Sequence, residues 1–102
     1  MANNLAKVQY LNIISPTKSK KKIIKLLAES GARGINTTYC KGSIDKGFLL
    51  QAFGIETEEN KLLTTCLIPL EKAQEIIEIL KTEFSFSKAN TGIAFSIPVG
   101  GF

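Results

Sequence analysis

The segment after Pro69 restricts the fold more than any other part of the chain, because its apolar residues keep a strict helical period. They recur at i, i+3, i+4 and i+7, with glutamates on the other side: Ala73, Ile76, Ile77 and Leu80. This pattern predicts an amphipathic helix over residues 70–82. A chain of 102 residues has room for one domain, so residues 1–102 are taken as a single unit.

A second helical pattern covers residues 19–30, where Ile23, Ile24 and Leu27 share one face. Gly31 follows, where a helix C-terminus favours a left-handed residue. Four segments rich in β-branched, aromatic or alternating apolar residues predict strands: residues 6–14, 35–41, 61–68 and 92–99. In the last strand large and small side chains alternate, so one face is expected to meet the core and the other something smaller.

The predicted order of elements is βαββαβ, which is typical of an α+β fold. It predicts a ferredoxin-like split βαββαβ sandwich, a four-stranded antiparallel sheet with two helices on one face. The other face would stay uncovered in a single subunit. We expect Leu11 or Ile13 and part of residues 62–67 to lie there, buried against other subunits.

Composition excludes several classes of protein. With 44% hydrophobic and 22% charged residues the chain is typical of soluble globular domains. Its apolar runs are far shorter than the ~20 residues needed to cross a bilayer and its polar start offers no signal-peptide core, so we expect it in the cytoplasm. Because the sequence has no histidine, Cys40 and Cys66 cannot form an ordinary Cys/His zinc cluster, and no metal site is expected. We interpret both cysteines as reduced, half-buried strand residues.

The basic residues concentrate locally, although the net charge is only +4. Four lysines precede or begin the first predicted helix: Lys18, Lys20, Lys21 and Lys22. The cluster is either a solvated first turn or a contact for an anion, a phosphate or a membrane surface.

Catalytic chemistry is not indicated, since no nucleophile stands beside a base, and we expect no enzymatic activity. Two other functions of the same fold remain as alternatives. Acyl or phosphoryl transfer is disfavoured because Arg33 follows the first helix rather than the first strand. RNA binding is disfavoured because the strand over residues 61–68 lacks aromatic side chains on which bases could stack.

The long connection over residues 42–60 contains a short amphipathic pattern that ends at Gly54. Its apolar residues either cover a core or dock on a partner protein, and the candidate partner contacts are Phe48, Leu49 and Phe53. Two glycine-containing segments could bind an anion through backbone amides. The first is Lys41, Gly42 and Ser43, and the second is Lys88, Ala89, Asn90, Thr91 and Gly92.

Three stretches together resemble the nitrogen-regulatory P-II proteins, in a short branch: AESGARGINTTYCKGS, LEKAQEIIEILKTEF and NTGIAFSIPV. The resemblance covers nearly the whole chain. It implies a homotrimer whose sheets line the centre, with clefts between subunits that bind adenine nucleotides. By position it implies that Gly42 lies at the loop base, Ile13 near the adenine pocket and residues 89–92 in the phosphate-facing loop. Gly92 departs from the family, whose typical nucleotide-binding members carry a lysine there.

The resemblance also implies partners, such as a membrane transport protein or a regulatory enzyme. The leading hypothesis is therefore a non-enzymatic trimeric regulator that senses a small ligand, with an adenine nucleotide as candidate, and acts through residues 42–60. The alternative from a different class is a structural trimer that binds no ligand. No nucleic acid partner is expected.

Overall fold

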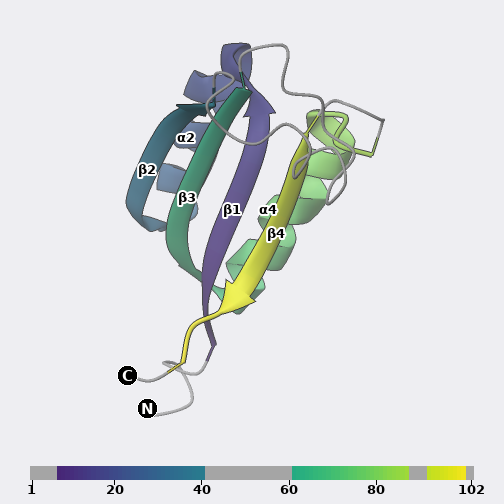
Figure 1. Ribbon diagram of the computed structural model, residues 1–102. Coiled ribbons are helices and arrows are strands. Elements are labelled where there is room, and N and C mark those ends of the chain that lie inside the picture. Colours follow the sequence, from purple (N-terminus) through teal and green to yellow (C-terminus); the bar gives the residue numbers. More distant parts are fainter. Residues whose placement is uncertain (1–6, 41–60, 88–91, 101–102) are drawn as a thin grey trace.

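The computed structural model describes residues 7–40, 61–87 and 92–100. Their elements follow in the order β1 (Val8–Pro16), η1 (Thr17–Ser19), α2 (Lys20–Glu29), β2 (Arg33–Cys40), β3 (Lys61–Pro69), α4 (Leu70–Glu83) and β4 (Ile93–Pro98). The strands form one antiparallel sheet in the order β2-β3-β1-β4. Both helices lie on the same face of that sheet (Figure 1), so the predicted α+β, ferredoxin-like fold is confirmed.

The helix boundaries follow local signals in the sequence. At the end of α2 the amide of Gly31 donates to the Ala28 carbonyl at 3.2 Å, and the amide of Ala32 donates to the Leu27 carbonyl at 3.0 Å. This pair of hydrogen bonds requires a left-handed residue, and Gly31 supplies it with φ +81. The start of α4 follows directly from Pro69, whose extended backbone has φ −60 and ψ 148. The short helical pattern predicted within residues 42–60 lies outside the described residues.

The hydrophobic core lies between the sheet and the two helices. Its buried side chains are Leu11 and Ile13 from β1, Cys66 and Ile68 from β3, Ile23 and Leu27 from α2, and Ala73, Ile76 and Leu80 from α4. The expectation that Leu11 or Ile13 lies on the uncovered face is therefore wrong. Successive side chains of a strand point to opposite faces of the sheet, and β1 carries apolar residues on both faces. Its sequence pattern therefore does not identify the face that meets the core.

In β4 the small side chains, and not the large ones, face the core. Ala94 pairs with Ile13 and packs against the core, so the small side chains face the helices. The large alternate residues Phe95 and Ile97 consequently lie on the other face. Phe84 and Phe86, which follow α4, also pack against the core, and a small residue in β4 suffices beside them.

Candidate functional site

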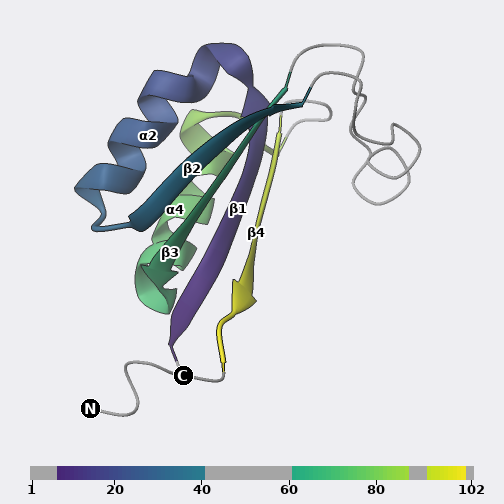
Figure 2. The same cartoon turned by 60° about the vertical axis from the view of Figure 1, so that its left-hand side comes forward.

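The second face of the sheet, the one without helices, carries exposed apolar side chains in a row. Tyr10 in β1 pairs with Leu67 in β3 and with Ile97 in β4, so the three residues are neighbours across the sheet. They are 39%, 40% and 47% exposed, respectively. Figure 2 shows that α2 and α4 both lie on one side of the sheet. This row is an apolar surface that a single subunit leaves open.

The two candidate ligand segments are attached to one end of the sheet. Residues 41–60 leave from Cys40 and return at Lys61, and these two residues pair directly. Lys61 also pairs with Pro16 at the end of β1, and Ile93, at the start of β4, pairs with Ile14 close by. The described residues that flank the two segments therefore lie close together at the same end of the sheet.

Most of the candidate residues themselves lie outside the described residues. These are Lys41, Gly42 and Ser43, then Lys88, Ala89, Asn90 and Thr91, and the candidate partner contacts Phe48, Leu49 and Phe53. Only Gly92 and Ile13 are placed. Ile13 is completely buried in the core between sheet and helices, so its side chain offers no surface to a ligand within one subunit.

Gly92 is held in a confined place at the start of β4. A Cβ built there would lie 2.5 Å from Cζ of Phe86 and 2.7 Å from the carbonyl oxygen of Ile14. Only a residue without a side chain fits between that ring and the backbone of β1. A lysine side chain would have no room at this position, and Gly92 allows the start of β4 to approach β1 closely.

Two lysines lie near this end: Lys61, which was not singled out from the sequence, and Lys20, which belongs to the lysine cluster predicted to be a solvated turn or an anion contact. Lys61 is only 6% exposed. Lys20 donates from Nζ to the Tyr39 hydroxyl at 3.1 Å, and its Nζ lies 5.1 Å from the ring centroid. This pair joins the start of α2 to the end of β2. In the sequence Lys61 stands out only because it begins an apolar strand. The contact between Lys20 and Tyr39 depends on tertiary packing, which the sequence pattern does not encode.

The chemistry of the described residues is sparse. Cys66 is a free thiol that is 1% exposed, in agreement with the prediction of a reduced strand residue, though more deeply buried than expected. Burial raises the pKa of the Cys66 thiol to about 11, so it is neutral near pH 7. Within the described ranges no group of three or more His, Cys, Asp or Glu side chains could hold a metal, and no helix is long and apolar enough to cross a bilayer.

Solved structures with the same fold include P-II-like signalling proteins. A P-II-like signalling protein from Thermus thermophilus aligns with a TM-score of 0.65 and 20% identity, over 90% of this chain and 86% of that one. The apo form of CPII from Thiomonas intermedia, a nitrogen regulatory P-II-like protein, gives a TM-score of 0.66 and 16% identity, over 90% and 88% of the two chains.

A second structure of the Thiomonas CPII protein contains ADP, AMP and acetate. It aligns with a TM-score of 0.63 and 20% identity, over 92% of this chain and 89% of that one. No protein-family model matches the sequence, and no curated protein matches it. At these identities the likeness shows the fold, and the resemblance drawn from the sequence is therefore confirmed as a P-II-like fold.

Proposed function

We propose that the chain is a non-enzymatic P-II-like regulator that assembles into a homotrimer and senses a small ligand between subunits. The observation that carries this proposal is the row Leu67, Tyr10 and Ile97 on the second face of the sheet. A domain of this size buries a modest share of its surface, and covering an apolar row by a second and third copy removes it from water. The P-II-like fold of the solved structures supports the same reading.

The ligand of this proposal is a small anion, with an adenine nucleotide as the first candidate. It is supported by the CPII structure that contains ADP and AMP. In this chain the proposed contacts are residues 41–43 and 88–92, whose flanking residues share one end of the sheet. Occupation of the cleft would favour one arrangement of residues 42–60 and so control a partner protein, such as a membrane transport protein or a regulatory enzyme.

The assembly is tested with Leu67→Asp, because a carboxylate placed on this face would be desolvated in the proposed interface. We expect the wild-type protein to have about three times the 11.1 kDa subunit mass in solution, and the variant to be a monomer or to fail to fold. Gln74→Asp, which adds the same charge to the exposed side of α4, should leave the mass unchanged. A wild-type monomer over the whole concentration range would refute the assembly.

The ligand is tested by calorimetric titration of the assembled protein with ATP, ADP, AMP and cyclic AMP. Saturable binding of one of them, lost in Gly42→Asp and kept in Gln74→Asp, is the expected result. A well-folded trimer that binds none of the four would instead favour the structural trimer without a nucleotide.

A further inference from the structure

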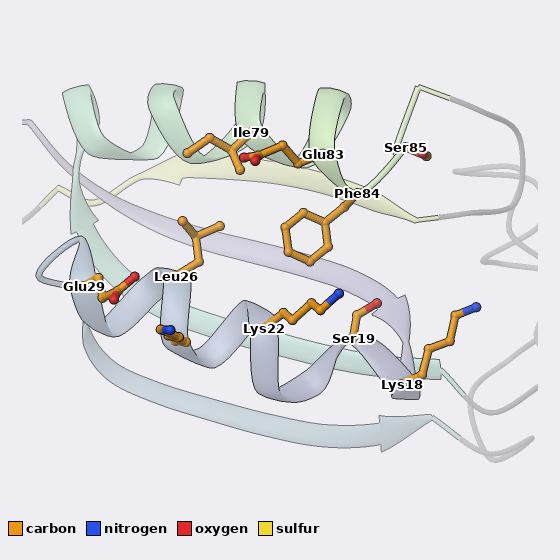
Figure 3. Close-up of a pocket in the computed structure, with 10 residues that line it drawn as sticks. Lys18, Ser19, Lys22, Leu26, Glu29, Ile79, Glu83, Phe84 and Ser85 are labelled. Atoms are coloured by element: carbon orange, nitrogen blue, oxygen red, sulfur yellow. The ribbon is translucent and has the colours of Figure 1, made fainter.

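A groove with a volume of about 770 Å³ runs between α2 and α4, on the helix side of the sheet. Figure 3 shows the two helices as its walls, with Lys22 and Phe84 on facing sides. One wall consists of residues from η1 and α2, namely Lys18, Ser19, Lys22, Lys25, Leu26 and Glu29. The other consists of Ile79 and Glu83 from α4 with Phe84 and Ser85 after it. The groove lies on the opposite side of the sheet from Tyr10, Leu67 and Ile97.

The α2 wall carries a regular row of positive charge. Lys18 from η1 and Lys22 and Lys25 from α2 recur at i, i+4 and i+7 in the sequence and line the groove, and Lys22 and Lys25 lie about one helical turn apart. The first turn of α2 holds no acidic residue. Lys72 pairs with Glu75 and Lys81 with Glu78 on α4, and neither ion pair includes a lysine of η1 or α2.

The two helices differ in whether their lysines form ion pairs. On α4 each lysine lies within 3.6 Å of a glutamate three residues away, as on an ordinary solvated helix face. On α2, Lys22 and Lys25 line the groove, and neither makes an ion pair in the described part of the chain. The positive charge is therefore available to a negatively charged group that comes from outside the subunit.

The floor of the groove is apolar. Leu26 from α2, Ile79 from α4 and Phe84 after α4 line it and keep part of each side chain open to the groove. Leu26 and Phe84 also pack against the core, which keeps the floor in place. A ligand with charge alone would leave these side chains in water, whereas an amphipathic ligand would cover them.

We propose that this groove docks an acidic amphipathic helical segment of a partner protein. Glutamates or aspartates at i, i+4 and i+7 of that segment would match the spacing of Lys18, Lys22 and Lys25. An adjoining apolar stripe would cover Leu26, Ile79 and Phe84. The groove is bounded by two helices, which suits an elongated helix. Glu29 and Glu83 also line it, so the partner segment carries neutral or basic residues at those two places.

This inference goes beyond the proposed function and does not depend on it. The groove lies within one subunit, on the opposite side of the sheet from Tyr10, Leu67 and Ile97. It therefore remains accessible in an assembly built through the second face, and it needs neither a nucleotide nor residues 42–60.

The experiment is an NMR titration of the isotope-labelled, full-length protein with a synthetic peptide. The probe is an acetylated and amidated helix of about four turns, with glutamates at i, i+4 and i+7 beside a stripe of leucines. We expect saturable shift changes at Ser19, Leu26, Ile79 and Ser85, with affinity that falls as salt is raised. A peptide of the same composition in scrambled order should bind at least about tenfold more weakly, because it presents no apolar stripe.

Two matched variants test the role of charge. Lys22→Glu reverses a charge inside the groove, and Lys72→Glu reverses an exposed charge on α4 outside it. We expect Lys22→Glu to weaken peptide binding by about tenfold or more and Lys72→Glu to change it less than about twofold. Equal weakening in both variants would show a nonspecific effect of net charge and overturn the proposal.

Other occupants of the groove would also be visible and would overturn the proposal. Binding to phosphatidylserine vesicles that requires Lys22, with no binding of the peptide, would identify a lipid surface. Self-association of the protein that Lys22→Glu abolishes would identify a second copy. Shift changes confined to the second face of the sheet would place the peptide elsewhere.

Discussion

Replacing Gly92 by alanine adds one methyl group at the tightest described glycine of the chain. The new Cβ would lie 2.5 Å and 2.7 Å from two ring atoms of Phe86 and 2.7 Å from the Ile14 carbonyl oxygen. Separations below 3.0 Å force a neighbour to move. The ring of Phe86 can shift, but the carbonyl belongs to β1, which pairs on both sides with β3 and β4. Overpacking of this kind costs about 1–3 kcal/mol.

The assay is urea and thermal unfolding at one fixed protein concentration. For a domain of about 100 residues each kcal/mol lowers Tm by roughly 4–8 °C, so we expect a fall of about 4–24 °C for Gly92→Ala. Two other glycines separate the causes. A methyl group at Gly100 would meet no described atom within 4 Å, so Gly100→Ala should stay within about 0.5 kcal/mol of wild type. Gly31 also has open space but has φ +81, so Gly31→Ala should cost about 1–2 kcal/mol through backbone strain alone.

A Gly92→Ala protein as stable as Gly100→Ala would refute the contact between the start of β4 and β1. The double variant with Phe86→Leu refines the test, since it removes the ring atoms and leaves the carbonyl. We expect the added cost of Gly92→Ala to be smaller in the Phe86→Leu background, though not zero. An unchanged cost would mean that the ring does not confine Gly92.

Three further substitutions probe other parts of the fold by urea unfolding. The Thr64 hydroxyl is buried without a hydrogen-bond partner among the described residues, so Thr64→Val should raise the free energy of unfolding by roughly 1 kcal/mol, and a loss would reveal a hidden partner. Lys21→Glu places an acid in the first turn of α2 and should stabilise by about 0.3–1 kcal/mol at low salt, with the gain disappearing in about 1 M NaCl at a Debye length of about 3 Å. Burial raises the pKa of Cys66 from 9.0 to about 11, so the unfolded chain loses its proton first. Stability should therefore be unaffected below about pH 9 and fall by up to about 2–3 kcal/mol toward about pH 11, a dependence that Cys66→Ala should remove.

The sequence predicts the fold well because its local signals agree with one another. The helix over residues 70–82 is observed as α4, residues 70–83, since its apolar period and the preceding proline indicate the same start. The helix end at Gly31 is likewise a local matter of backbone conformation. Such features depend on near neighbours in the chain and need no knowledge of the tertiary structure.

The assignment of strand faces could not be made in the same way. β1 has apolar residues at both Leu11 and Tyr10, so its alternation alone does not say which side meets the helices. The register with β3, in which Leu11 pairs with Cys66, decides the matter. The same holds for Gly92, because its contact with Phe86 joins residues whose proximity no periodic pattern encodes. Most residues of the candidate ligand segments lie outside the described ranges, so their roles stay predictions.

The arrangement of the chain separates its exposed apolar row from its basic groove. Tyr10, Leu67 and Ile97 lie on one side of the sheet, and Lys18, Lys22 and Lys25 lie along a groove on the other. Association through the first surface removes apolar area from water without covering the second, because the sheet stands between them. In the proposed assembly each subunit would therefore still present its own basic groove. The two surfaces should therefore respond independently to substitution, since neither shares a side chain with the other.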